Sequence, residues 1–268
     1  MFKHQFKTAW RALKAYKAYS LINVLGLTLG ISACLVIFLV VQYELSYDQY
    51  HKKASRIYRV TLNAIDFNPS VSMAVVPALR TDFPELEQVT QVLYQQSGLV
   101  KIGATKYEEK GFAFADHQFT SVFDYEWLAG NSITALSAPN SAVLTETIAK
   151  KWFGKTDPMG QLVNLENGYN LKVTGMIKDL PGNTHLPFNF LVSFETLRQE
   201  MQDQGSMSSF YAIHGGSFAY IVMPPNMNPQ QLQQRIPGFI AKNWGENIAK
   251  EARLPCNHLQ IYILTNDI

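Results

Sequence analysis

The chain has only two cysteines in 268 residues, Cys34 and Cys256. The first lies in a long apolar run and the second near the end of the chain, so we do not expect them to pair. A fold held together by disulfides is therefore excluded. The hydrophobic fraction of 47% is high enough for a sizeable core, which indicates a body stabilised by packing.

The residue patterns of common catalytic and cofactor sites are also missing. The six histidines are dispersed, with no pair four residues apart and no cysteine partner at zinc-ligand spacing. No glycine-rich phosphate loop is followed by a lysine, and no Gly-x-Ser-x-Gly elbow occurs. The sequence predicts no catalytic, metal-binding or cofactor-binding residue, and we do not expect an enzyme.

Two short segments resemble catalytic elements only superficially. Residues 214–217 (His-Gly-Gly-Ser) are similar to an oxyanion-type turn, but a glycine pair before Ser-Phe-Ala-Tyr more often forms a loop that enters a strand. Asp116 and His117 could act as an acid–base pair, but sequence neighbours on a strand point to opposite faces. We interpret this pair as part of the surface or of a turn.

Acidic residues are absent from the first 43 positions, and no charged residue lies between Lys17 and Glu44. Residues 20–43, inside this gap, are predominantly apolar. A hydrocarbon core of ~30 Å needs about 20 helical residues at a rise of ~1.5 Å each. We therefore predict a transmembrane helix over residues 20–43.

A cleaved signal peptide is the main alternative for this segment, and residues 31–34 (Ile-Ser-Ala-Cys) are similar to a lipoprotein processing site. Seven apolar residues follow Cys34, however, whereas such a cysteine should close the apolar region. The run is also longer than the roughly 7–15 residues of a signal-peptide core. These two observations favour an uncleaved signal-anchor.

The charges around the span predict its orientation. Five basic residues precede it, namely Lys3, Lys7, Arg11, Lys14 and Lys17. Short positive flanks stay in the cytoplasm, so residues 44–268 are expected on the extracytoplasmic side. The other 18 Lys and Arg residues and all 21 Asp and Glu residues follow the span, which gives that part a net charge of −3. This balance offers no basic surface for nucleic acid.

Residues 1–19 have the pattern of a basic amphipathic helix. Aromatic and apolar side chains fall on one arc at 100° per residue (Phe2, Phe6, Ala9, Trp10, Leu13 and Tyr16), and Lys3, Lys7, Arg11 and Lys14 fall on the neighbouring arc. Such a helix lies in the membrane interface, where it binds the lipid bilayer. A disordered basic tail is the alternative.

Small residues recur at one spacing within the predicted span. Gly26, Gly30 and Cys34 are four residues apart, a pattern that lets a second helix approach closely. Asn23 and Thr28 add polar groups that a lipid-facing helix would rather lack. We predict that this helix packs against a partner helix through these three positions.

Beyond the span, the alternation of apolar residues and the turn signals predict an α+β fold with mixed sheets. Strands are expected at residues 56–62, 89–100, 101–114 (two strands around a turn at Gly103), 171–177, 188–194, 218–223 and 259–264. Helices are expected at residues 71–83, 145–153, 195–202 and 229–243. Thr145 is expected to begin the second of these helices and Gly154 to end it.

Several turn-rich stretches carry a family resemblance. Residues 46–51 (Ser-Tyr-Asp-Gln-Tyr-His) with 55–60 resemble the segment that follows the first membrane helix in ABC-transporter permeases of the FtsX/MacB type, in the form common in Bacteroidetes-like bacteria. Residues 149–154 (Ala-Lys-Lys-Trp-Phe-Gly) and 179–188, which contain Asp-Leu-Pro-Gly-Asn-Thr-His, are similar to later motifs of that family. Further matching stretches are 114–116, 122–125, 128–131, 157–160 and 173–175.

The same stretches have a plain physical interpretation, because their residues favour turns. Gly154 and Gly160 permit unusual backbone angles, and Asp157-Pro158 is typical of a turn start. None of these residues is a chemical reagent. We interpret the stretches as positions that fix the shape of the domain.

The resemblance implies a MacB-like periplasmic core domain inserted after the first helix of a permease in the bacterial inner membrane. In this family the domain often has two parts, and we expect an inserted subdomain near residues 113–215 so that late strands return to those near Arg56. The implied partners are an ABC ATPase subunit, the remaining permease helices and a second permease copy in a homodimer or pair. The implied function is export, efflux or envelope remodelling driven by the ATPase.

The sequence differs from the family in one respect, since it ends at Ile268, where a return to the membrane is expected. We therefore expect a fragment or a truncated gene product that cannot transport alone. The alternative from another class is a membrane-anchored extracytoplasmic sensory or ligand-binding domain, which requires a deep pocket with convergent polar groups. The substrate is not predicted by any of these features.

Overall fold

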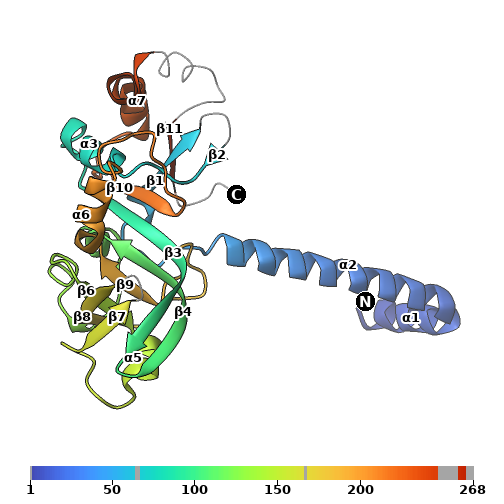
Figure 1. The fold of residues 1–268 in the computed structure, drawn as a ribbon. Helices are drawn as coiled ribbons and strands as arrows, with labels where there is room; N and C mark the ends of the chain where they lie inside the picture. Colours follow the sequence, from blue (N-terminus) through green and yellow to red (C-terminus); the bar gives the residue numbers. More distant parts are fainter. Residues whose placement is uncertain (1, 64–66, 166–167, 247–258, 264–268) are drawn as a thin grey trace. The chain divides into compact units, whose positions relative to one another are not determined.

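The computed structural model describes residues 2–63, 67–165, 168–246 and 259–263. It divides into two compact units, an N-terminal unit (Met1–Tyr47) and a larger unit (Asp48–Ile268) that we call the body. Each has its own local structure, and Figure 1 draws both.

The N-terminal unit consists of two helices, α1 (Phe2–Ala15) and α2 (Lys17–Glu44). Among the described residues, α2 is the one helix long and apolar enough to cross a membrane, and it contains the predicted span. In α1 the rings of Phe6 and Trp10 stack 6.4 Å apart, and Lys14 Nζ lies 5.7 Å from the Trp10 ring. The aromatic side of α1 is thus continuous for at least one turn.

The body contains strands and short helices joined into one mixed sheet, which confirms the α+β prediction. The strands are β1 (Ile57–Asn63), β2 (Phe67–Asn68), β3 (Gln88–Ile102), β4 (Thr105–Ala115), β5 (Trp127–Gly130), β6 (Ser141–Thr145), β7 (Leu162–Leu165), β8 (Tyr169–Ile177), β9 (Phe190–Ser193), β10 (Ser217–Val222) and β11 (Leu259–Ile263). The helices are η1 (Ala54–Arg56), α3 (Val75–Asp82), α4 (Phe119–Val122), α5 (Glu146–Phe153), α6 (Glu195–Asp203) and α7 (Pro229–Trp244).

The strand order is β11-β1-β10-β3-β4-β9-β6-β8-β5, with β2 beside β1 and β7 beside β3 and β8. Pairs β4–β9 and β6–β8 are parallel, and the other pairs are antiparallel. Strand β10 comes late in the chain and lies between β1 and β3, so the last part of the chain returns to its first strand. In Figure 1, α3 and α7 lie at one end of the body and α5 and β7 at the other.

A long hairpin of β3 and β4 connects the two ends of the body. The predicted turn at Gly103 is present, with φ at +58°. Near the middle of β4, Gly111 has φ at +69°, and a Cβ there would lie 2.9 Å from the carbonyl oxygen of Pro187. This position therefore requires glycine for both backbone angle and space.

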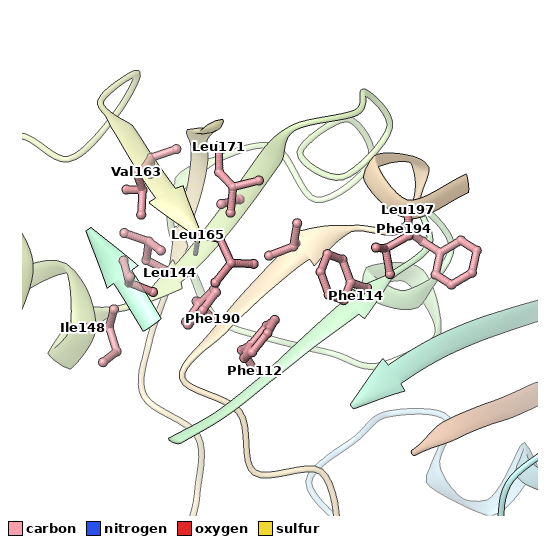
Figure 2. Close-up of a cluster of buried hydrophobic side chains, with 14 of the residues drawn as sticks. Phe112, Phe114, Leu144, Ile148, Val163, Leu165, Leu171, Phe190, Phe194 and Leu197 are labelled. Atoms are coloured by element: carbon pink, nitrogen blue, oxygen red, sulfur yellow. The ribbon is translucent and has the colours of Figure 1, made fainter. Parts of the chain in front are cut away.

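The core consists of three clusters of buried apolar side chains. The first lies under α3 and α7 and includes Leu79, Ile221 and Phe239. The second lies between the β3–β4 hairpin, β6–β9, α5 and α6, and Figure 2 shows its aromatic and aliphatic side chains converging from these elements. The third joins the other two and is built around Phe119, Phe123 and Tyr220.

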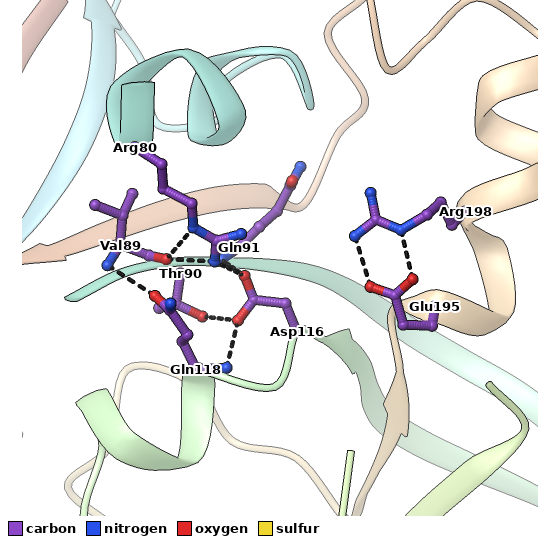
Figure 3. Close-up of polar contacts among 8 residues, drawn as sticks. All are labelled: Arg80, Val89, Thr90, Gln91, Asp116, Gln118, Glu195 and Arg198. Carbon is purple, nitrogen blue, oxygen red and sulfur yellow. Dashed lines mark hydrogen bonds and ion pairs between the residues drawn. The ribbon is translucent and has the colours of Figure 1, made fainter. Parts of the chain in front are cut away.

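A buried ion pair ties α3 to the hairpin. Asp116 is 3% exposed and accepts a hydrogen bond of 2.6 Å from Arg80 Nη2. It also accepts from the Thr90 hydroxyl and from the Gln91 and Gln118 backbone amides, as Figure 3 shows. Of the two alternatives for the pair Asp116 and His117, surface or turn, the turn is the one that fits Asp116, while His117 is exposed. The position of Asp116 directly after β4 matches the expected turn, but its carboxylate points into the protein, where polar groups satisfy it.

Candidate functional site

The strongest polar cluster of the body lies where the chain enters it. Asp48 is the first residue of the body and follows the end of α2 by four positions. Its φ is +56°, a left-handed conformation that aspartate tolerates better than most residues. The residue is 3% exposed, so its carboxylate faces inward.

Three hydrogen bonds from the loop before β9 hold the Asp48 carboxylate. The backbone amide of His185 and the hydroxyl of Thr184 each lie 3.2 Å from Oδ1, and His185 Nδ1 lies 2.5 Å from Oδ2. The backbone amide of Asp48 donates to the carbonyl of Asn183 at 3.0 Å. The chain entry and this loop are therefore joined through both main chain and side chains, although 137 positions separate Asp48 from His185.

His185 continues the network into the centre of the sheet. Its Nε2 lies 2.8 Å from the hydroxyl of Tyr220, which is fully buried on β10. An ionised Asp48 can only accept, so Nδ1–H donates to it, while Nε2 makes the hydrogen bond to the Tyr220 hydroxyl. One imidazole thus connects the entry residue to a core strand.

The chain entry also contacts the segment around Asp124, through His51. Its Nδ1 accepts a hydrogen bond of 3.0 Å from the backbone amide of Asp124, and Asp124 Oδ2 accepts one of 2.7 Å from the amide of Lys52. The rings of Tyr50 and Phe123 lie 4.0 and 5.1 Å from the imidazole. We call the set Asp48, Tyr50, His51, Asp124, Thr184, His185 and Tyr220 the junction cluster.

Burial and charge set the protonation of the junction cluster. Burial lowers the pKa of His51 to about 4, although the carboxylates of Asp48 and Asp124 oppose that change. Burial acts to raise the pKa of Asp48, but the hydrogen bonds and charge of His185 outweigh it and lower that pKa. Burial raises the pKa of Tyr220 well above its usual value. At neutral pH, His51 is neutral and Asp48 is ionised.

The junction cluster has the residue types of a catalytic triad but not its access to a substrate. Tyr220 is fully buried, and its raised pKa disfavours the phenolate. Within the part of the chain that the structure describes, no group of three or more His, Cys, Asp or Glu side chains is arranged to hold a metal ion. The arrangement can join segments firmly, and its tyrosine hydroxyl is enclosed, whereas the His185 side chain is 19% exposed.

The predicted helix-packing residues lie on α2, outside the junction cluster. Gly26, Gly30 and Cys34 are spaced along one side of the helix. A Cβ at Gly26 or Gly30 would meet no other atom of the described residues within 4 Å, and Cys34 is an exposed free cysteine. Packing of a partner helix on these positions stays a prediction.

Sequence reasoning missed the junction cluster because its members come from distant stretches. Asp48, Asp124 and His185 each lie in a different one of the turn-rich stretches, which we assigned to shape alone. The usable signal was that each stretch carries an Asp or His beside its turn residues. Nothing local indicates that these side chains meet.

A family model described as the MacB-like periplasmic core domain matches residues 20–239 of this chain. The fold is similar to a domain of a protein assigned as a permease from Porphyromonas gingivalis, with a TM-score of 0.62 and 21% identity over 72% of this chain and 86% of that one. It is also similar to the periplasmic region of MacB from Actinobacillus actinomycetemcomitans, with a TM-score of 0.52 and 13% identity over 70% and 84%. The search of curated proteins gives no match.

Proposed function

The chain belongs to the MacB-like periplasmic core domain family, and on this basis we propose that it is the first membrane helix and the extracytoplasmic domain of an ABC-transporter permease. The family and helix α2 together indicate a membrane-anchored protein with an extracytoplasmic domain. The finer part of the proposal is a mechanical role. ATP-driven motion of a partner ATPase moves α2, and the body converts that motion into export, efflux or envelope remodelling.

The observation that carries this proposal is the junction cluster. A force applied along α2 reaches the body at Asp48, because the chain is continuous from Glu44 to that residue. Asp48 is bonded to His185, and His185 to Tyr220 on β10, a strand between β1 and β3. A displaced entry residue would therefore displace a central strand and not only a surface loop.

The remaining parts of the proposal concern location and assembly. We place α1 at the cytoplasmic face of the bacterial inner membrane and residues 44–268 in the periplasm. Residues 113–215 form an inserted subdomain, and the permease works as a homodimer or pair with its partner helices on Gly26, Gly30 and Cys34. No catalytic residue is assigned to this chain, and the hydrolysing site belongs to the ATPase.

The experiment is to express the full chain in bacterial membranes together with an ATP-binding-cassette subunit from the same organism. We expect the two to co-purify, and we expect ATP to change amide hydrogen exchange around residues 46–51 and 183–186. The variant Asp48→Ala should keep the association but reduce the ATP-dependent change in exchange at 183–186. The matched control Asp157→Ala should behave like the unchanged chain, because the Asp157 carboxylate makes a local, exposed hydrogen bond with the amide of Met159.

Two results would contradict the proposal. One is ATP hydrolysis by the purified chain alone. The other is an ATPase complex in which exchange in the body is the same with and without nucleotide. The second result would favour an anchored sensory or ligand-binding domain.

A further inference from the structure

The body has an open hollow of about 550 Å³ that lies apart from the junction cluster. It is formed by the β3–β4 hairpin, the ends of β7 and β8, and one side of α6. Its volume is within the range of roughly 300–1,000 Å³ that is typical of small-molecule sites. The hollow is therefore large enough for a small organic molecule but not for a folded partner.

The floor of this hollow is apolar. Phe112, Phe114, Leu165 and Leu197 line it, and none of them is more than 5% exposed. Figure 2 shows these side chains converging from β4, β7 and α6. A Cβ on Gly98 would lie 2.6 Å from the Phe112 ring, so the missing side chain of Gly98 allows this ring to occupy its place in the floor.

The rim of the hollow is acidic. Glu108 on β4 and Glu200 on α6 line it, and among the described residues no Lys, Arg or His lines the hollow. Glu200 accepts a hydrogen bond from the hydroxyl of Tyr169, which orients its carboxylate. The single cation of α6, Arg198, is bonded twice to Glu195, at 2.5 and 2.6 Å (Figure 3). Within the part of the chain that the structure describes, the two rim carboxylates therefore have no cationic partner among the residues that line the hollow.

We propose that this hollow binds a small organic cation that carries an apolar group. The apolar group covers the Phe and Leu floor and is removed from water. The positive charge is attracted by the two rim carboxylates. An anion with the same apolar group meets like charge and is excluded. The proposal does not depend on the permease role, because it concerns binding alone.

The test uses the full chain in detergent, labelled with ¹³C at the methionine methyl groups. Met201 lines the hollow, and Met223, which is 2% exposed in the first core cluster, is the internal reference. The probes are benzyltrimethylammonium, benzyl alcohol and benzenesulfonate, which share a ring and differ in charge. We expect saturable movement of the Met201 signal with the ammonium probe, at least fivefold weaker binding of the alcohol, and no binding of the sulfonate.

Substitutions of the rim carboxylates show whether the ammonium probe binds through their charge or only partitions into detergent. The double variant E108Q/E200Q should weaken binding of the ammonium probe by tenfold or more, while Glu200→Gln still accepts from Tyr169. The control E85Q/E126Q removes two surface carboxylates outside the hollow and should bind like the unchanged chain. An unchanged Met223 signal shows that a variant is folded. Equal binding of the three probes, unchanged affinity in E108Q/E200Q, or the absence of saturation would overturn the proposal.

Discussion

At the scale of single residues, backbone angle and space decide which glycines cannot be replaced. Gly216 precedes β10 and has φ at +83°, and a Cβ there would lie 2.5 Å from the carbonyl oxygen of Tyr94. Gly154 ends α5 with φ at +60°, but no atom outside its neighbours lies within 4 Å of its Cβ position. The two residues therefore separate the effect of conformation from that of crowding.

We expect Gly216→Ala to lower the free energy of unfolding by about 3 kcal/mol or more, because strain from a left-handed alanine of roughly 1–2 kcal/mol adds to a clash with backbone. Gly154→Ala should lower it by about 1–3 kcal/mol, because φ at +60° with ψ at −111° is strained for alanine but no clash is added. Urea unfolding followed by tryptophan fluorescence measures both. Equal losses in the two variants would show that the contact with Tyr94 is relieved by movement.

The protonation of His51 gives a second prediction at this scale. Its ordinary pKa is 6.5 and burial lowers it to about 4, so the unfolded chain binds the proton more readily. Stability should therefore fall as pH drops from about 6.5 to 4, by about 3 kcal/mol from this residue, and level off below. The lowered pKa of Asp48 affects stability in a different pH range. Its contribution to the free energy of unfolding is fully present above the ordinary pKa of 3.8 and is lost as the pH falls through the folded pKa.

The variant His51→Asn tests this assignment, because its Oδ1 can accept from the Asp124 amide as Nδ1 does. The difference in stability between the unchanged chain and this variant should vary with pH between 4 and 6.5 and be constant above 7. The matched control His117→Asn makes the same substitution at an exposed histidine. A difference that does not vary with pH would contradict burial of neutral His51.

At the scale of elements, buried polar contacts fix the positions of helices relative to strands. Apolar packing alone is less specific about these positions. Arg80 of α3 reaches the carbonyl of Val89 and the carboxylate of Asp116, which lie on β3 and directly after β4. The side chain of Asp116 is only 4% exposed, so its interactions are screened weakly. This pair fixes the register of α3 against the hairpin.

We expect Asp116→Asn to lower the free energy of unfolding by about 2–4 kcal/mol, because a neutral amide cannot accept from all four donors and leaves Arg80 without its carboxylate. The control Glu126→Gln breaks an exposed pair with Lys178 and should change it by less than about 0.5 kcal/mol. Urea titration of both variants measures the difference. A loss at Asp116 as small as that at Glu126 would mean that water replaces the network.

The elements that sequence predicted are those with a local pattern. Strand β8 alternates between buried and less buried residues, and it was predicted at 171–177. Gly154 was predicted to end a helix, and it does so at α5. Strand β6 was missed because all five of its residues are buried, which removes the alternation. The short strands β2, β5 and β7 and helix α4 were also missed, since two to four residues carry no period.

The contacts of the junction cluster could not be predicted for a different reason. His185 contacts Asp48 because the sheet topology brings the loop before β9 next to the chain entry. This topology depends on the pairing of all the strands and not on the residues near either turn. The sequence indicated that turns occur at both places. It contained no information on which turn meets which.

At the scale of the whole molecule, the two units differ in what stabilises them. The body has its own buried core in three clusters, whereas no residue of α2 is buried. Changes on α2 should therefore leave the stability of the body intact and act only on what surrounds the helix. This separation allows the predicted packing positions to be tested without unfolding the domain.

We expect the double variant G26I/G30I to weaken association of α2 with a second helix in the membrane, because two branched side chains prevent close approach on that side. The control S32I adds a branched side chain about half a turn away from Gly30 and should associate like the unchanged helix. In a chain that carries Cys256→Ser, oxidative cross-linking through Cys34 measures association of two copies. A drop in cross-linking for G26I/G30I alone assigns the packing face, while equal cross-linking in both variants would contradict it. Because Ile favours the membrane at least as well as Gly, lost insertion cannot cause the expected drop, and the unfolding of the body in urea should be the same in all three chains.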